Sequence, residues 1–416
     1  MLLTGEDGDV TMRKKEGEKM YTVENSRHFT KRTDPVSGMP YYILSTRLAP
    51  VQQGFYFVNS GFSDDGRYFW FYYAFPPAPA HGAGVIDLAT DEIALFPETA
   101  GTGDAIFMVD GQNGDLWWGN NQGYFRRSPD PKEKPVRIAP LPEIATHGRL
   151  TSAGTHLTFS PDRKFFFVDI GFGDRSTLGA IEVATGKYTE WFQTPLGVPY
   201  NHAQWNPVDP NLVLCAHEHH TDFFTGEVTR PANTPDGVYP RLHTLTPDGK
   251  DTMYPSLFSS ATHEWWSADG KKIYYVDGRH ILRRNLETGA HEVAVDCGRF
   301  HNKEELPITA WHAYCTADER YFVSDASYYS HGGLRWWRGC PSKVTFYNTV
   351  TDRAVPIVTL NPEVSEWTPE TPCPYHIDPH PRFVLKDKWI TFTATVDGRV
   401  DVAVAPVKPL LEATQK

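Results

Sequence analysis

The segment WSADGKKIYYVD at residues 266–277 decides the fold, because it places a polar turn directly before an alternating, aromatic β-strand. Related phrases, each with Ser, Asp, Asn or Gly ahead of a strand, stand at residues 62–70, 109–118, 159–169, 205–214, 315–325 and, in degenerate form, 383–392. The period is roughly 45 to 70 residues, and such a repeat predicts a repeat architecture.

Second turns between these phrases join two β-rich runs, as hairpins do. They are ATDE at 89–92, EVATGK at 182–187, NLETGA at 285–290 and NTVTDR at 348–353. Two turns per period give about four antiparallel strands, and about seven such sheets packed radially form a seven-bladed β-propeller. Six or eight blades, a pair of β-sandwiches and a long meander are the alternatives.

The expected organisation is a single all-β propeller domain over residues 41–410, preceded by a partly mobile extension over residues 1–40. Residues 41–45 are expected to add an outer strand. Aromatic residues make up 13% of the chain, and Gly and Pro number 33 each. That composition suits many short strands joined by tight turns.

Charge and hydropathy exclude several classes of partner. The formal net charge is -11, and no basic run stands out beyond residues 13–15, so a nucleic-acid partner is not expected. No stretch of about 18 apolar residues occurs, so no membrane partner is expected either. An anionic substrate would need a locally positive cleft, which the 17 histidines could supply.

The five cysteines are an odd number at irregular spacings, so they do not indicate a disulfide framework. The first 20 residues are polar and lack the apolar core of a signal peptide. The expected location is the cytoplasm; a protein that had lost a signal peptide would be periplasmic or secreted.

Histidines gather at the starts of the repeats, where the innermost strand of each blade would face the central channel. They lie at 156, 202, 217, 219, 220, 263 and 312, and in the phrase HIDPH at 376–380. Burying several imidazoles near one another is costly unless a metal or an anion satisfies them. A single histidine is as often a satisfied core or surface residue.

The expected metal ligands are His263, His312, Cys315 and His380. Three imidazoles and one thiolate make a closed tetrahedral set suited to zinc, with manganese or calcium as alternatives. His312 and Cys315 are three residues apart, as in many zinc sites. Cys315 could instead be a small buried residue.

The candidates for proton transfer are His202, His217 and Tyr239. Arg241 and His156 are the candidates for binding a substrate carboxylate. The competing interpretation is that Tyr239 packs and that Arg241 pairs with a surface carboxylate. The neighbouring histidines at 219 and 220 are expected in solvent or at the rim of the cleft.

Four phrases carry a family resemblance: NHAQWNP at 201–207, CAHE at 215–218, HEWWSADG at 263–270 and HPRF at 380–383. They resemble those of the propeller-type polysaccharide lyases, the oligogalacturonate lyases and ulvan lyases, over about residues 55–407. The resemblance implies a seven-bladed propeller that binds an anionic, uronate-containing oligo- or polysaccharide. It also implies cleavage by β-elimination, which leaves a 4,5-unsaturated uronate end.

The two parts of the family imply different site roles. Similarity to oligogalacturonate lyases implies a histidine-held metal with His263 as a ligand and His217 as the base. Similarity to ulvan lyases implies a structural zinc with His and Cys ligands, and proton transfer by His202 and Tyr239. Cys315 favours the zinc of the ulvan type. The glycan linkage, endo or exo action and the oligomeric state are left open.

Two other functions compete with the lyase. One is a non-catalytic propeller that binds carbohydrate or protein, since this architecture hosts many functions. The other is a metal-dependent hydrolase or lactonase, which would release product without forming a double bond.

Overall fold

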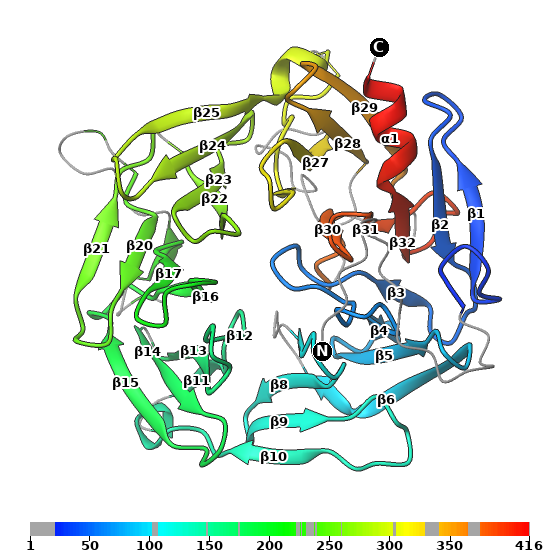
Figure 1. Ribbon diagram of the computed structural model, residues 1–416. Coiled ribbons are helices and arrows are strands. Elements are labelled where there is room, and N and C mark those ends of the chain that lie inside the picture. Colours follow the sequence, from blue (N-terminus) through cyan, green and yellow to red (C-terminus); the bar gives the residue numbers. More distant parts are fainter. Residues whose placement is uncertain are drawn as a thin grey trace, which may run out of the picture.

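The structure, a computed structural model, describes residues 21–101, 107–146, 149–173, 175–221, 225, 227–229, 237, 239–258, 260–302, 305–328, 341–364 and 375–415. These residues form seven antiparallel sheets of four or five strands arranged around one central axis (Figure 1). The seven-bladed β-propeller expected from the repeats is therefore confirmed.

The blades follow one another along the chain, and each runs from an inner to an outer strand. The first blade consists of β3 (Val51–Gln53), β4 (Tyr68–Ala74), β5 (His81–Asp87) and β6 (Glu92–Gly101). The second consists of β7 (Met108–Val109), β8 (Leu116–Asn120), β9 (Gly123–Arg127) and β10 (Val136–Ala139). The third consists of β11 (Leu150–Ser152), β12 (Thr158–Phe159), β13 (Phe165–Phe172), β14 (Arg175–Glu182) and β15 (Tyr188–Gln193).

The fourth blade consists of β16 (Asn201–Trp205), β17 (Val213–Ala216), β20 (Leu242–Leu245) and β21 (Asp251–Tyr254). The fifth consists of β22 (Thr262–Trp266), β23 (Lys272–Val276), β24 (His280–Asn285) and β25 (His291–Asp296). The sixth consists of β26 (Ala313–Cys315), β27 (Tyr321–Ser327), β28 (Ser342–Asn348) and β29 (Arg353–Asn361). A separate hairpin, β18 (His220–Thr221) and β19 (Val228–Thr229), lies between β17 and β20. The short helices are η1 (Glu143–Thr146), η2 (Cys297–Phe300) and α1 (Val407–Thr414).

The seventh blade closes the ring with both ends of the chain. Its strands are β30 (Arg382–Val384), β31 (Trp389–Ala394) and β32 (Asp401–Pro406), followed by β2 (Pro40–Leu44) and β1 (Phe29–Thr33). Tyr42 pairs with Val404, and Ile43 pairs with Ala403. The outer strand expected at 41–45 is β2, and the sheet extends before residue 41, where we expected the domain to begin. The first 20 residues of the expected extension lie outside the described residues.

The repeated phrase forms the turn between the inner strand and the next strand. In the fifth blade, Ser267 Oγ donates to Asp269 Oδ1 at 2.6 Å, and the amide of Gly270 donates to the carbonyl of Ser267 at 2.9 Å. Gly270 has a φ of 68°, which glycine adopts without steric cost. The same Ser-to-Asp contact recurs at Ser160 and Asp162, so these two blades share one local motif.

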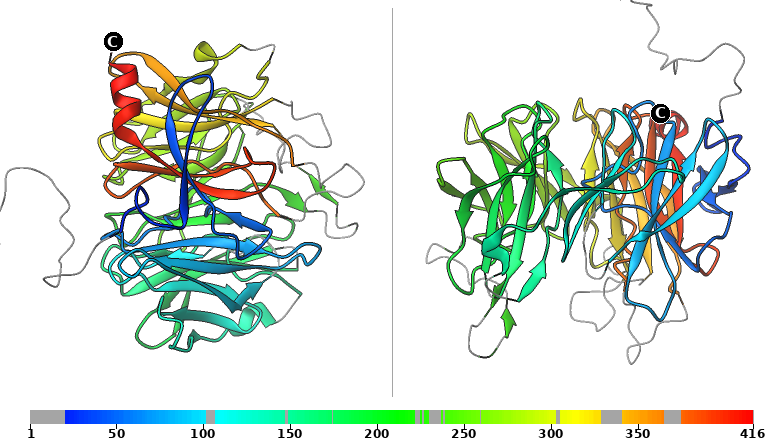
Figure 2. Two further views of the ribbon diagram at one scale, coloured as in Figure 1. Left: turned by 90° about the vertical axis from the view of Figure 1, so that its right-hand side faces the viewer. Right: turned by 90° about the horizontal axis from the view of Figure 1, so that it is seen from below.

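Buried aromatic and aliphatic side chains fill the spaces between neighbouring blades. Phe167 of the third blade, for example, packs with Trp205 and Val213 of the fourth. Seen edge-on in Figure 2, the sheets stand side by side around the ring, and the red helix α1 lies beside the blue N-terminal strands.

Among the described residues, no helix has the length and apolar character needed to cross a membrane. Three described cysteines, Cys215, Cys297 and Cys315, are buried and free.

We expect the closing strand to control the stability of the whole ring. Ile43 is 0% exposed, so Ile43→Ala should lower the free energy of unfolding by about 2 to 5 kcal/mol. Val36, which is 75% exposed, provides the control, and Val36→Ala should have little effect. Chemical denaturation measures both; equal losses in the two variants would contradict this role of β2.

Candidate functional site

The inner strands bring histidines from five blades to the axis. His202 lies in β16 and His263 in β22, whereas His156, His312 and His380 lie just before β12, β26 and β30. Their rings surround one tyrosine, Tyr56. The six imidazoles in contact with Tyr56, which we call the histidine cluster, are His156, His202, His263, His312, His376 and His380, at ring-centroid distances of 4.7 to 6.4 Å.

Tyr56 is the central residue that sequence reasoning missed. It lies in the segment after β3, and Figure 1 shows this blue segment reaching toward the middle of the ring. Burial raises the pKa of Tyr56 well above its usual value, and the charges of Glu264 and Glu218 add to the effect. In a chain with 20 tyrosines, no sequence pattern marked this one.

Three of these histidines occupy the left-handed backbone region, which is uncommon for residues other than glycine. The φ angles are 56° at His202, 52° at His263 and 48° at His380. At the first two positions the strand pairing also shifts register, between Asn201 and Gln204 and between Thr262 and Trp265. These bulges re-aim the side chains at the start of each inner strand.

One part of the cluster could hold a metal ion. His312, His376, Asp378 and His380 each offer a ligand atom, and these atoms lie within 4.8 Å of one another. Within the described residues, Nε2 of His312 and both ring nitrogens of His380 are buried without a hydrogen-bond partner. His312 Nδ1 lies 2.8 Å from Asp325 Oδ2. A carboxylate behind a histidine in this way fixes the imidazole so that the other nitrogen can bind a metal.

Two expected ligands are placed differently. His263 lies against this group, with its ring centroid 4.1 Å from that of His312. Cys315 instead packs between the fifth and sixth blades with Trp265 and Tyr274, and burial raises the pKa of its thiol to about 12. The structure therefore does not bring Cys315 to the metal-capable group. Its place in β26 turns it toward the neighbouring blade, since side chains alternate along a strand.

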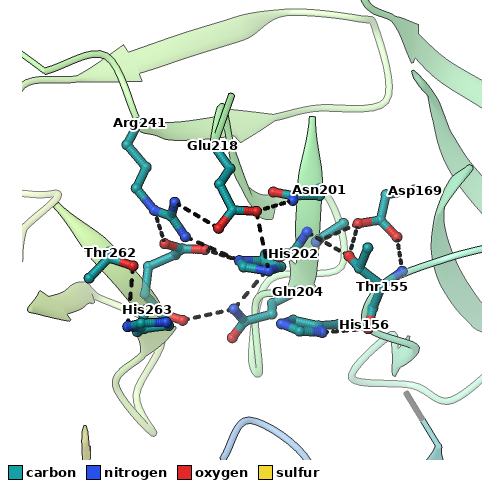
Figure 3. Close-up of polar contacts among 12 residues, drawn as sticks. Thr155, His156, Asp169, Asn201, His202, Gln204, Glu218, Arg241, Thr262 and His263 are labelled. Carbon is teal, nitrogen blue, oxygen red and sulfur yellow. Dashed lines mark hydrogen bonds and ion pairs between the residues drawn. The ribbon is translucent and has the colours of Figure 1, made fainter. Parts of the chain in front are cut away.

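A second part of the site is a charged network, shown in Figure 3. Arg241 Nε donates to Glu264 Oε2 at 2.8 Å, and Arg241 Nη2 lies 3.2 Å from His202 Nδ1. His202 Nδ1 also lies 3.3 Å from Glu264 Oε1. Glu218 lies 3.6 Å from Arg241 and 3.9 Å from His202 Nε2, and it accepts a hydrogen bond from Asn201 at 2.6 Å.

Arg241 is enclosed by this network, which argues against its expected contact with a substrate carboxylate. Its side chain is 2% exposed and faces both Glu218 and Glu264. Burial opposes its charge, but Glu264 and Glu218 together raise its pKa. For Glu264, burial is likewise outweighed by Arg241 and His202, so that its pKa falls to about 2.

Burial and a neighbouring histidine hold both His156 and His217 neutral. His156 Nδ1 lies 2.6 Å from the Thr155 carbonyl, and its ring stacks on that of His202 at 4.7 Å. Burial and His202 lower the pKa of His156 to about 3. Burial and the nearby His243 lower the pKa of His217 to about 4. In the described part of the chain, Nε2 of each is without a hydrogen-bond partner.

The remaining expected residues are Tyr239 and His220. Tyr239 is 5% exposed and packs among Leu214, Leu242 and Trp266, and it also interacts electrostatically with Arg241. His220 is exposed in β18, which fits the rim.

Comparison with known proteins supports the fold more than the chemistry. No family model and no curated protein matches the sequence. A solved structure described as oligogalacturonate lyase in complex with manganese is 18% identical and covers 93% of this chain and 97% of its own, with a TM-score of 0.68. The structure of an oligogalacturonate lyase from Vibrio parahaemolyticus is 17% identical, and the match covers 91% of this chain and 96% of that one, with a TM-score of 0.66. The chain therefore has the fold of these structures, as the resemblance implied.

The enclosed state of Arg241 gives a stability prediction. Arg241→Met would leave Glu264 buried without its cation, so the free energy of unfolding should fall by about 3 to 5 kcal/mol. Arg67 pairs with Asp87 through a side chain that is 41% exposed, and Arg67→Met should cost about 1 kcal/mol or less. Denaturant titration compares the variants; a near-zero loss for Arg241→Met would show that its side chain is not part of a buried network.

Proposed function

We propose that the protein is a lyase that cleaves uronic-acid-containing oligo- or polysaccharides by β-elimination, leaving a 4,5-unsaturated uronate end. The observation that carries the proposal is that two kinds of group lie at or beside the starts of the inner strands. One is the metal-capable set around His312 and His380, and the other is the set of His202 and His217 with oppositely shifted pKa values. The shared fold with structures described as oligogalacturonate lyases supports the reaction class.

The chemistry requires both kinds of group. The C5 proton of a uronate is weakly acidic, because removing it places negative charge next to a carboxylate. Positive charge near that carboxylate stabilises the enolate-like charge that develops. A neutral base must take the proton, and the oxygen that leaves C4 must receive one.

His312, His376, Asp378 and His380 fit a divalent transition metal. Three imidazoles and one carboxylate suit zinc and also manganese, whereas calcium prefers oxygen ligands throughout. When bound, such an ion would supply the positive charge that neutralises the uronate carboxylate. The thiolate of Cys315 was the ligand that favoured zinc over manganese, and Cys315 is not in this set.

His217 is the base in this proposal. Burial keeps its imidazole neutral, and its Nε2 has no hydrogen-bond partner among the described residues, so it could accept a proton. It directly follows β17, whose last residue, Ala216, pairs with Asn201 beside His202. The two histidines therefore stand on neighbouring strands of one blade.

A substrate screen tests the reaction class. Incubation with pectic, ulvan, alginate and glycosaminoglycan fragments should give a rise in ultraviolet absorbance from the conjugated double bond with at least one of them. Mass spectrometry of the product should show no added water at the unsaturated end. Cleavage with water added would indicate a hydrolase, and binding without cleavage would indicate a non-catalytic propeller.

Metal analysis tests the ligand group without relying on activity. His312→Ala and His380→Ala should each lose most of the bound ion and melt at a lower temperature, because the binding free energy is withdrawn from the folded state. Cys315→Ser should keep its ion, since this thiol packs between blades. Loss of the ion in Cys315→Ser together with its retention in His380→Ala would refute this set in favour of the thiolate site.

A further inference from the structure

Glu264 is a buried carboxylate to which sequence reasoning assigned no role. Its side chain is 0% exposed, and it links the guanidinium of Arg241 to the imidazole of His202. Its carbonyl oxygen also accepts a hydrogen bond from the Gln204 side chain at 2.9 Å, so the residue is held from both sides. The position of Glu264 is therefore fixed by three neighbouring groups.

The charges around His202 do not balance unless its imidazole is protonated. Arg241 brings one positive charge, whereas Glu264 and Glu218 bring two negative ones. A buried negative charge without a positive partner lowers the stability of the folded state. A second proton on His202 supplies the missing positive charge. Burial and the charge of Arg241 oppose that proton, but Glu218 and Glu264 outweigh both and raise the pKa of His202.

The other groups that face His202 do not supply this positive charge. His156, stacked on it, has a pKa lowered to about 3, and burial also lowers the pKa of His219. Tyr56 has a raised pKa and stays neutral. Asp169, which accepts from the amide of Ala203 at 3.2 Å, can only add negative charge.

The two ring nitrogens of His202 face different surroundings, and only Nε2 faces the partly exposed side of the network. Nδ1 faces Glu264 and Arg241, both of which are buried. Nε2 faces Glu218, whose side chain is 39% exposed, and the His202 side chain itself is 14% exposed. The Nε2 proton is therefore the one that a substrate oxygen could reach.

We propose that Glu264 is a positioning residue that keeps His202 doubly protonated, so that His202 Nε2 donates the proton to the departing oxygen. This rests on the lyase function proposed above. His217 takes the C5 proton, the electrons of the C5–H bond form the C4–C5 double bond, and the C4–O bond breaks. The oxygen takes the Nε2 proton of His202. The turnover ends with His217 protonated and His202 neutral, and proton exchange with water restores both.

Titration of His202 in the intact protein tests the role of Glu264 whether or not a substrate is known. NMR of protein labelled in its histidine rings follows each imidazole, and the signal missing from His202→Gln assigns it. Glu264→Gln keeps the shape and removes the charge, so His202 should lose its proton at a lower pH than in the wild type. An unchanged titration of His202 in Glu264→Gln would overturn the proposal.

Glu319 provides the matched control. It is a carboxylate, largely shielded from solvent, that pairs with Lys272 and Tyr274, both at 2.8 Å, in the turn before β27. Glu319→Gln removes an ion pair of similar kind without touching the histidine cluster. It should lower stability but leave the titration of His202 unchanged. A shift as large as that in Glu264→Gln would mean that general loosening, and not the lost charge, moves His202.

Leaving-group dependence tests the donor role once a cleaved uronate is found. His202→Gln should lower kcat by about 10²- to 10⁴-fold on the glycan, whose departing oxygen needs a proton. The loss should be much smaller with a uronate that carries a nitrophenyl ether at C4, because a nitrophenolate leaves without protonation. In Glu264→Gln the alkaline limb of the kcat/KM profile should move to lower pH. Equal losses of kcat on both substrates would rule His202 out as the donor.

These results separate the two proposals. If no uronate gives an unsaturated product, the lyase function fails, whatever the His202 titration shows. If the product forms but His202→Gln is equally impaired with both leaving groups, the lyase stands and the assignment of His202 fails.

Discussion

The pairing of β2 with β32 is the interaction on which the site depends. It joins the two ends of the chain in one sheet through Tyr42, Ile43 and their partners, and so holds seven blades in a closed ring. Only in a closed ring do inner strands that begin near residues 156 and 380 point at the same small volume. The histidine cluster around Tyr56 is thus a product of closure and not of any local motif.

The closed ring creates two electrical environments side by side. On one side, burial lowers the pKa values of His263 and His380 well below the usual value, which keeps lone pairs on their nitrogens. On the other side, Glu218 and Glu264 hold positive charge on Arg241 and favour it on His202. In a protein with a net charge of -11, the ring thus places metal-capable imidazoles beside a cationic Arg241.

The sequence was sufficient for the fold and for the histidines, because both depend on repeated local chemistry. A turn in which a Ser or Thr hydroxyl donates to an Asp two residues later marks four of the seven blades, and imidazoles at the strand starts mark the axis. It was insufficient wherever a side chain's direction depends on packing between blades. Cys315 lies three residues from His312 but faces the neighbouring sheet, and Asp378 offers a ligand atom although it was not among the expected ligands. Tyr56 gains its importance from a ring contact with His156, 100 residues away in the chain, and Glu264 from a contact with His202, 62 residues away, and no spacing rule applies over such distances.

The left-handed backbone at His202, His263 and His380 bears on how such a protein can change over generations. Glycine adopts this backbone conformation without steric cost, so a single replacement by glycine at any of these positions would relieve backbone strain and remove the imidazole at the same time. Selection for stability alone would favour losing these imidazoles. A lineage in which these imidazoles served no function would drift toward a more stable propeller without them, and glycine at these three positions would mark that loss.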